Sequence, residues 1–348
     1  MSATLKSSGP RTGARHATPV RAPRLALAGC GIVGSALVRL LADDALPGWS
    51  PRDVAVVLVR DPARPRDVAL PGESFTADAQ AFAAVRARVV VEALVGIEPA
   101  RTLARATLRR GARYVTANQQ VVAAHGAELA RLAEQHGGSL DFEAAAGGAV
   151  PVVRALRDGL AGTGVQAVRG VLNGTTNFVL TAALAGTDVH DAVRDAQARG
   201  FAEADPSRDL DGHDAADKLR LLAWLAFGVA PHQLPVQVDG FAPAADHLRE
   251  AAARGAVVRQ VAEVRRTAAG LSARVALQVL EADDPLASVT RERNRVVVES
   301  RSAGALVFEG PGAGGEATAG AIIADLRRGG GALPGQRVVR LAAPMAGL

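Results

Sequence analysis

The chain has 348 residues, a formal net charge of +5, 49% hydrophobic residues and a single cysteine. This length and composition predict a water-soluble protein of about two domains. Aromatic residues make up only 3% of the chain and the arginines are scattered, which disfavours nucleic-acid partners. No apolar run approaches the roughly 20 residues of a membrane span. One cysteine excludes an internal disulfide and suits a cytoplasmic location.

The first 21 residues are rich in Ser, Thr, Gly, Pro and Arg, and no acidic residue precedes Asp43. An organellar transit peptide has a similar composition, but it also carries an amphipathic helix pattern that this segment lacks. We therefore predict a disordered basic tail over residues 1–21.

Folded structure is predicted to begin at Arg24, where a short apolar run leads into a glycine-rich turn and then into a helical pattern. Glycines in this context permit a tight turn, close approach of a pyrophosphate, and packing of the helix on the strand. The phosphate would lie at the helix N-terminus. A generic strand-to-helix turn is the alternative interpretation. The predicted nucleotide contacts are Gly29, Gly31, Ile32, Val33 and Gly34.

A second strand pattern, residues 54–59, ends at Arg60 and Asp61. An acidic residue at this place accepts a hydrogen bond from the 2′-hydroxyl of NAD, whereas arginine suits the 2′-phosphate of NADP. Both residue types are present, and Arg64 and Arg66 follow closely. This excess of cations favours NADP, with NAD possible, and makes Arg60 a predicted contact.

Strand and helix patterns then alternate, which is typical of a parallel, doubly wound sheet. The predicted strands are 88–92, 114–117 and 140–143, and the predicted helices are 99–110 and 123–136. We therefore predict a Rossmann NAD(P)-binding domain over residues 22–150.

The pattern changes after Pro151. A predicted helix over 152–160 and a strand over 168–172 precede Asn173–Asn177, a polar turn that opens a helix. Its backbone N–H groups and hydroxyls could receive a carboxylate, and ordinary helix capping is the alternative. Strand patterns at 257–267, 273–279 and 294–300 predict an α+β domain with an open mixed sheet over 151–308. A glycine loop at 310–315 and a helix at 319–326 begin a C-terminal segment, 309–348, predicted to return to the nucleotide-binding domain.

The stretch Glu203–Lys218 contains six carboxylates and one lysine. The only other lysine of the chain is Lys6, because arginine occupies every other position that needs a permanent cation. Lysine differs from arginine in having a compact ammonium that can give up its proton. Lys218 is therefore a candidate proton donor, and the alternative is a surface lysine on a solvated acidic helix.

The chain resembles the homoserine dehydrogenase family over roughly residues 24–330. The resemblance rests on an ordered set of motifs: Gly29–Gly34, Thr116–Asn118, Glu143–Gly148, Leu172–Asn177, Gly200–Pro206, Asp214–Lys218 and Gly310–Gly314. It implies a Rossmann domain followed by a catalytic and dimerisation domain, and hence a homodimer. Since the sequence ends at Leu348, we expect no C-terminal regulatory domain of the kind that many relatives carry.

The resemblance implies reduction of L-aspartate 4-semialdehyde to L-homoserine by NAD(P)H, in threonine and methionine biosynthesis. Lys218 would protonate the carbonyl oxygen that receives negative charge with the hydride. Asp214, four residues earlier on a helix, would orient the lysine. The predicted substrate contacts are Glu203 and Asp209 for the ammonium, and Gly174 and Thr175 for the carboxylate.

The same resemblance implies further cofactor and cation contacts. The remaining predicted cofactor contacts are Thr116, Asn118, Gln119, Gly312 and Gly314. In the family, backbone carbonyls also hold a monovalent cation, usually Na⁺. The matching positions are Glu143, Ala146, Gly148 and Val150.

Two residues depart from the family pattern. Gln119 stands where the family has a lysine, and Phe201 stands where tyrosine is common. Glutamine can donate a hydrogen bond but has no charge and cannot shuttle a proton. Two alternatives to an active homoserine dehydrogenase therefore remain open. One is a reductase of the same fold for a related amino-aldehyde or keto substrate, and the other is a catalytically weak NADP-binding protein with a structural or regulatory role.

Overall fold

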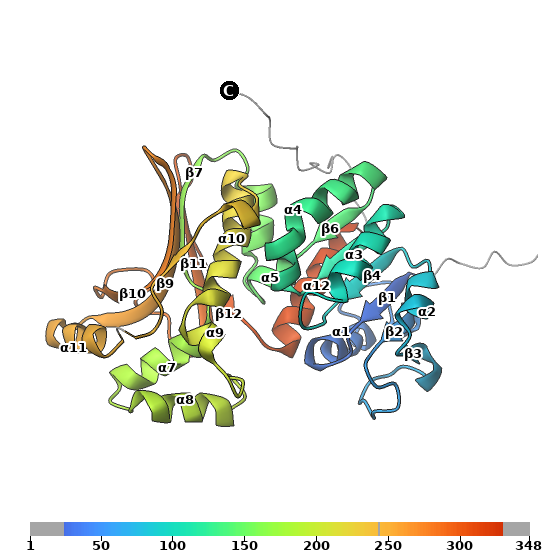
Figure 1. Ribbon diagram of the computed structural model, residues 1–348, viewed down its shortest axis with the longest axis horizontal. Helices are drawn as coiled ribbons and strands as arrows, with labels where there is room; N and C mark the ends of the chain where they lie inside the picture. Colours follow the sequence, from blue (N-terminus) through green and yellow to red (C-terminus); the bar gives the residue numbers. More distant parts are fainter. Residues whose placement is uncertain (1–23, 243, 330–348) are drawn as a thin grey trace, which may run out of the picture.

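The computed structural model describes residues 24–242 and 244–329. Two lobes, each built on its own sheet, lie side by side (Figure 1). The predicted tail, 1–21, and residues 330–348 of the predicted C-terminal segment lie outside the described residues. No described helix is long and apolar enough to cross a membrane.

The first lobe contains a six-stranded parallel sheet in the order β3-β2-β1-β4-β5-β6. Its strands are β1 Leu25–Ala28, β2 Val54–Leu58, β3 Phe75–Thr76, β4 Val89–Glu92, β5 Arg113–Thr116 and β6 Ser139–Asp141. Its helices are α1 Ile32–Ala42, α2 Ala79–Ala84, α3 Ala100–Arg109 and α4 Gln119–His136, with short 3₁₀ turns at Pro51–Asp53 and Gly72–Ser74. The strand order reverses between β1 and β4, so a nucleotide crevice is expected at their carboxyl ends.

The second lobe contains a mixed sheet in the order β12-β11-β7-β9-β10-β8, antiparallel except for β8 beside β10. Its strands are β7 Val165–Val171, β8 Gln237–Val238, β9 Val257–Thr267, β10 Gly270–Leu280, β11 Arg293–Ser300 and β12 Gly304–Pro311. Its helices are α7 Gly174–Leu184, α8 Val189–Ala198, α9 Ser207–Leu210, α10 His213–Phe227 and α11 Ala244–Arg254, with a 3₁₀ turn at Pro231–Gln233. The predicted fold class, a Rossmann domain with a mixed-sheet α+β domain, is confirmed.

Several local predictions were wrong. The strand predicted over 140–143 ends at Asp141, and Glu143 begins α5, Glu143–Ala146, because the Glu143 carboxylate is buried and accepts hydrogen bonds from the backbone of the next segment. The helix predicted over 152–160 is a short α6, Val152–Arg154, followed by a π-helical turn, Ala155–Gly159. Gly310 and Pro311, predicted as loop, form the end of β12.

The helix α12, Gly315–Gly329, leaves the second lobe and packs in the first. Its Ile322 and Leu326 share a hydrophobic cluster with Leu37 and Leu41 of α1. Figure 1 shows α12 among the elements of the first lobe, where it packs against α1 and α5. The chain therefore crosses back to the first lobe after residue 311.

The largest hydrophobic core runs from one lobe into the other. It includes Leu129 of α4, Leu219 of α10 and Val168 of β7. The rings of Phe142 and Trp224 stack with centroids 5.7 Å apart, which joins α10 to the first lobe. As Figure 1 shows, α10 thus lies between the second sheet and α4. This packing brings the start of α4 to the face of α10 that carries Asp214 and Lys218.

Candidate active site

The turn after β1 is shaped for a phosphate group. Gly29 has φ +96°, and a Cβ there would lie 2.5 Å from the carbonyl oxygen of Ala93. A Cβ on Gly34 would lie 2.1 Å from the carbonyl oxygen of Gly29. The space beside Gly31 is open. Gly29 and Gly34 therefore maintain the turn, and Gly31 leaves room for a ligand.

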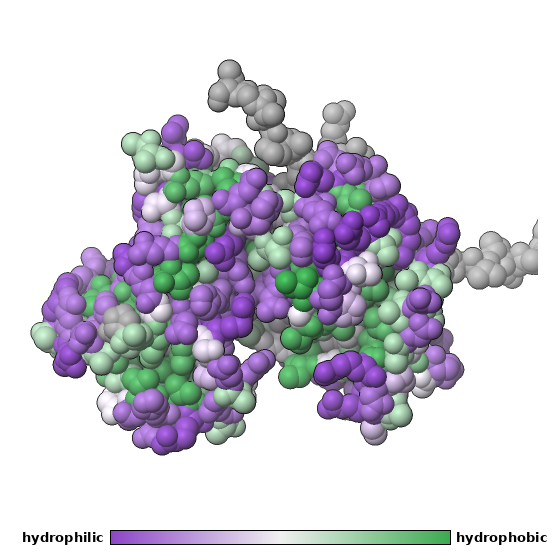
Figure 2. Space-filling model, in the orientation of Figure 1, coloured by the Kyte–Doolittle hydropathy of each residue, from purple (hydrophilic) through white to green (hydrophobic). Residues whose placement is uncertain are grey.

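The start of α1 is uncapped and exposed. No side chain caps Gly31 and no acidic residue lies in the first turn. Ile32 is 79% exposed, and Val95, in the loop after β4, is 94% exposed. Figure 2 shows the surface hollowed between the two lobes, at the lower edge of the view. Free backbone N–H groups at a helix N-terminus bind anions, so these residues fit a dinucleotide pyrophosphate.

The loop before α12 reaches the same place. A Cβ on Gly315 would lie 2.8 Å from Cγ2 of Ile32, so the two helix starts are in contact. Gly314 has φ +111° and open space beside it. Gly312 has no such space, because a Cβ there would lie 2.1 Å from Nδ2 of Asn294. Of the two predicted cofactor contacts in this loop, Gly314 faces open space and Gly312 faces protein.

Thr116 and Asn118 are buried around Glu92, the last residue of β4. The Thr116 hydroxyl donates to Glu92 at 2.6 Å, and Nδ2 of Asn118 donates to the carbonyl oxygen of Gly96 at 2.7 Å. Burial raises the pKa of Glu92, against the hydrogen bonds it accepts. These side chains hold the loop after β4, so their effect on a cofactor is through that loop. Glu92 was not singled out from the sequence, where it looks like the end of an apolar strand.

Lys218 and Asp214 form an ion pair on one face of α10. Nζ of Lys218 lies 2.8 Å from Oδ2 of Asp214 and 3.0 Å from the carbonyl oxygen of Leu172. Both side chains are largely buried. The spacing of four residues predicted this pairing, and the Leu172 carbonyl was not foreseen.

Asp214 collects three donors from three parts of the chain. Besides Lys218, it accepts from Nδ2 of Asn173 at 2.9 Å and from Nε2 of Gln119 at 2.5 Å. Burial alone would raise the pKa of Asp214, but the charge of Lys218 and these hydrogen bonds lower it overall. Asp214 is therefore an anion that holds Lys218 in place. Gln119, at the start of α4, contacts the acid–base pair directly.

Asn173 bonds both Asp209 and Asp214, two carboxylates to which the sequence analysis assigned different roles. Its Nδ2 donates to Asp209 at 2.8 Å as well as to Asp214, and its Oδ1 accepts from the Thr176 N–H and so caps α7. Burial, and then the negative charge of Asp214, raises the pKa of Asp209. Asp209 has no cationic side chain bonded to it among the described residues. In the sequence, Asn173 stood out as part of a polar turn before a helix, and its bonds to the two carboxylates were not foreseen.

The remaining predicted substrate residues, Gly174, Thr175 and Glu203, lie in different surroundings. The Thr175 hydroxyl donates to the carbonyl oxygen of Phe201 at 2.6 Å, and the Thr176 hydroxyl donates to that of Asp209 at 2.8 Å. These hydroxyls tie α7 to the acidic segment, because their protons are engaged by backbone carbonyl oxygens. The backbone N–H groups of Gly174 and Thr175 begin α7. Glu203 is exposed and stands outside the hydrogen-bonded cluster of the described residues.

Comparison with known proteins identifies the family. The family model for homoserine dehydrogenase matches residues 151–326, and the model for its NAD-binding domain matches residues 29–143. A homoserine dehydrogenase of Corynebacterium glutamicum is 40% identical over 340 residues, covering 93% of this chain and 74% of that protein. The chain belongs to the homoserine dehydrogenase family. Membership confirms the predicted enzyme class, an NAD(P)-dependent oxidoreductase.

Other relatives agree with this assignment. A homoserine dehydrogenase of Synechocystis is 38% identical over 314 residues, which are 87% of this chain and 72% of that protein. The crystal structure of a homoserine dehydrogenase from Thiobacillus denitrificans superposes with a TM-score of 0.81 at 31% identity, covering 88% of this chain and 74% of that one.

The homoserine dehydrogenase cation positions cluster around α5. The carbonyl oxygens of Glu143 and Val150 accept backbone hydrogen bonds from Gly147 and Val152, each leaving a second lone pair. Gly148 has φ +55°, and with Glu143 it lines a cavity of about 290 Å³ beside α12. No group of three His, Cys, Asp or Glu side chains in residues 24–242 and 244–329 is arranged to hold a metal ion.

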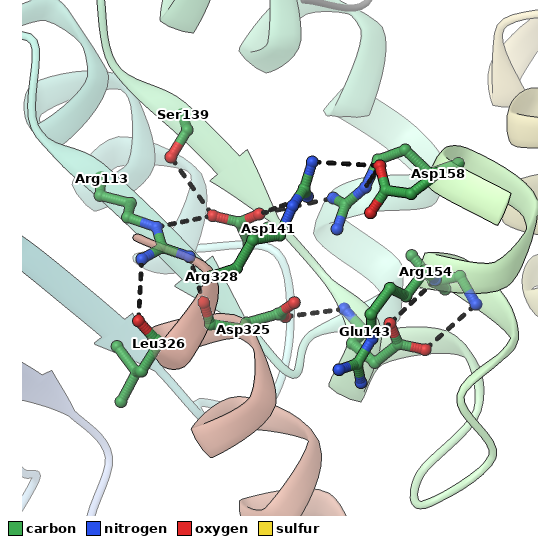
Figure 3. A network of polar contacts seen from close by, with 11 residues as sticks. Arg113, Ser139, Asp141, Glu143, Arg154, Asp158, Asp325, Leu326 and Arg328 are labelled. Atoms are coloured by element: carbon green, nitrogen blue, oxygen red, sulfur yellow. Dashed lines mark hydrogen bonds and ion pairs between the residues drawn. The ribbon is translucent and has the colours of Figure 1, made fainter. Parts of the chain in front are cut away.

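A buried charge network fastens α12 to the Rossmann lobe (Figure 3). Arg113 donates to Asp141 at 2.8 Å and to the carbonyl oxygens of Asp325 and Leu326. The Asp325 carboxylate is buried and accepts from the Glu143 N–H at 3.0 Å. Burial, and then the negative charges of Asp141 and Glu143, raises the pKa of Asp325 to about 7.

We expect Asp325→Asn to stabilise the protein more at pH 8 than at pH 5. Because the native pKa of Asp325 is about 7 and the unfolded value is near 3.9, the native state binds the proton more tightly. The stability that this group contributes is present below about pH 4 and is lost as the pH rises through 7. Thermal unfolding at the two pH values measures the difference. Asp158→Asn, at the exposed edge of the same network, is the matched control, and an equal shift at both pH values for Asp325→Asn would contradict the expectation.

Proposed function

We propose that the chain interconverts L-aspartate 4-semialdehyde and L-homoserine, with Lys218 as the proton donor and acceptor. One observation carries this assignment. The Lys218 ammonium has three N–H groups, of which Asp214 and the Leu172 carbonyl engage two. The third has no partner among the described residues, and the two anchors fix its direction.

The proton transfer follows from this arrangement. When a nicotinamide cofactor is held by the glycine turn, it would supply a hydride to the aldehyde carbon. The carbonyl oxygen then gains negative charge, and the free N–H of Lys218 stabilises that charge and delivers the proton. Because the pKa of Asp214 is lowered, Asp214 stays ionised and keeps the lysine in position throughout.

The substrate is bound through its amino-acid group. At this site, Asp209 is a largely buried carboxylate that accepts from Asn173 and has no cationic side chain bonded to it among the described residues, and we propose that it receives the α-ammonium. The N–H groups of Gly174 and Thr175 at the start of α7 would receive the α-carboxylate. Glu203 stays a predicted ammonium contact. A zwitterion therefore spans the space between α7 and the start of α10.

The cofactor proposal is NADP, with NAD possible. The uncapped start of α1 and the open space at Gly31 fit a pyrophosphate, and Arg60 is exposed at the carboxyl end of β2. We also propose that a monovalent cation such as Na⁺ binds the carbonyl oxygens of residues 143, 146, 148 and 150, supported by their clustering around α5. A homodimer and a cytoplasmic location stay predictions.

Arg60→Ala should raise KM for NADPH about tenfold or more and leave KM for NADH unchanged. The guanidinium can form charge-assisted hydrogen bonds only with the 2′-phosphate that NADPH carries. Arg52, exposed at the opposite end of β2, provides the matched control variant Arg52→Ala. Steady-state kinetics with both cofactors measure the effect, and an equal rise in both KM values would count against the NADP assignment.

Gln119→Lys should raise kcat for semialdehyde reduction severalfold. Gln119 donates to Asp214, so a lysine at 119 would add a second positive charge beside the oxygen that becomes negative. Gln120→Lys is the charge-matched control, because Gln120 lines a different cavity with Arg208 and Arg220. An unchanged or lower kcat in Gln119→Lys, with normal folding, would indicate that the pocket has been rebuilt around the neutral amide.

The activity test uses purified protein with aspartate semialdehyde and NADPH, following cofactor oxidation. Turnover supports the proposed function. NADPH binding without turnover of this substrate refutes it, and a panel of related amino-aldehydes and keto acids then separates the reductase of altered specificity from the catalytically weak homologue. Turnover that persists in Lys218→Ala refutes the proton-donor assignment alone.

A further inference from the structure

Asn294, near the start of β11, is a buried amide that shares a hydrogen-bond acceptor with Lys218. It is 1% exposed, and its Nδ2 donates to the carbonyl oxygen of Leu172 at 2.9 Å. That oxygen is the one that also accepts from Lys218 at 3.0 Å. A carbonyl oxygen has two lone pairs, so Asn294 occupies one and leaves the other for the ammonium. Asn294 thereby fixes the orientation of an anchor of the proton donor.

The other side of the Asn294 amide meets the loop before α12. A Cβ on Gly312 would lie 2.1 Å from Nδ2 and 2.4 Å from Oδ1 of Asn294, closer than any side chain can approach. Gly312 shows no left-handed φ that would itself require glycine. The asparagine is therefore the reason that position 312 must lack a side chain.

The loop before α12 also contacts the glycine turn proposed to bind the nucleotide. Three residues beyond Gly312, Gly315 contacts Ile32 at the start of α1. The Asn294 amide thus stands between the glycine loop and the carbonyl that anchors Lys218. Its Oδ1 is buried and has no hydrogen-bond partner among the described residues, which is a cost of about 1–3 kcal/mol for such a group.

We infer that Asn294 is a positioning residue for Lys218, acting through the Leu172 carbonyl and held in place by the close approach of Gly312. The inference rests on the proposed role of Lys218 as proton donor. It assigns Asn294 no contact with substrate. Its consequence is that a change in the loop at Gly312 would displace Asn294 and so alter the position of the Lys218 ammonium.

The first test compares Asn294→Ala and Asn294→Asp in the intact enzyme. Both remove the N–H donor to Leu172, and the aspartate keeps the shape of the side chain. We expect kcat for semialdehyde reduction to fall about tenfold in each, the effect of losing one buried hydrogen bond, while KM for NADPH changes less than about twofold.

Asn177→Ala is the matched control for a merely structural effect. Asn177 is a buried asparagine of the same lobe, whose Nδ2 donates to the carbonyl oxygens of Val289 and Arg291 and whose Oδ1 is likewise unpaired. It should lower the midpoint of thermal unfolding as Asn294→Ala does, with a much smaller effect on kcat. Equal kcat values for Asn294→Ala and the wild type, or equal kcat losses in Asn294→Ala and Asn177→Ala, would overturn the inference.

The second test is a double-mutant cycle with Gly312→Ala. In the wild-type background the new methyl must displace the Asn294 amide, and kcat should fall about as far as in Asn294→Ala. In the Asn294→Ala background the space is free, so Gly312→Ala should cost little more, giving strong non-additivity. Additive losses refute the coupling. If Lys218→Ala keeps its turnover, the proton-donor assignment on which this inference rests has failed, whereas absence of turnover in the wild type would mean that the proposed function has failed. If Lys218→Ala is inactive but Asn294→Ala is not impaired, only the role of Asn294 has failed.

Discussion

Lys218→Ala should lower kcat for semialdehyde reduction about 10²- to 10⁴-fold, the usual contribution of a general acid. The variant removes the Lys218 ammonium, whose third N–H has no partner among the described residues. NADPH binding, measured by quenching of cofactor fluorescence, should be unchanged, because the glycine turn and Arg60 lie on other elements.

Lys218→Arg separates charge from proton transfer. Arginine keeps the positive charge opposite the buried Asp214 carboxylate and so preserves folding, but its guanidinium does not release a proton at neutral pH. We therefore expect it to be nearly as inactive as the alanine variant while unfolding at close to the wild-type temperature. An arginine variant with most of the wild-type kcat would show that Lys218 contributes charge alone.

Asp209→Asn should raise KM for aspartate semialdehyde about 10- to 100-fold with a smaller effect on kcat. Asp209 is proposed to bind the substrate ammonium, and a hydrogen bond between charged groups in a largely buried site is worth about 1.5–3 kcal/mol. Asparagine keeps the size of the side chain and an oxygen that can accept from Asn173. KM for NADPH should not change.

The matched control for Asp209→Asn is Asp211→Asn, a carboxylate two residues later that has no bond to Asn173. It should leave both KM values near those of the wild type. If Asp209→Asn lowered kcat strongly and left KM unchanged, Asp209 would belong with the proton-transfer residues and the ammonium would bind elsewhere.

The pKa shifts of Asp209 and Asp214 have opposite directions, which agrees with the different roles proposed for them. The pKa of Asp214 is lowered and that of Asp209 is raised, although Asn173 bonds both. Burial acts to raise the pKa of both carboxylates, but at Asp214 the charge and hydrogen bond of Lys218 help to outweigh burial, whereas at Asp209 the negative charge of Asp214 adds to it. An ammonium bound at Asp209, as proposed, would relieve this repulsion.

The sequence by itself determined the local parts of the site. A glycine turn between a strand and a helix depends on residues close together in the chain, so Gly29, Gly31 and Gly34 could be assigned from spacing. The pairing of Asp214 with Lys218 likewise follows from the helical repeat. The alternation of strands and helices was enough to predict the parallel sheet, and the strand patterns after residue 257 were enough to predict the mixed sheet.

Only the tertiary structure decided the contacts between distant segments. Asp214 meets Gln119 across 95 residues, Lys218 meets Leu172 across 46, and Asn294 meets Leu172 across 122. No periodicity relates such pairs, because they come together only when α10 packs between the second sheet and α4. The buried amides Asn173 and Asn294 therefore look like ordinary polar residues in the sequence. In the fold, Asn173 shares the Asp214 carboxylate with Lys218, and Asn294 shares the Leu172 carbonyl with Lys218, the proposed proton donor.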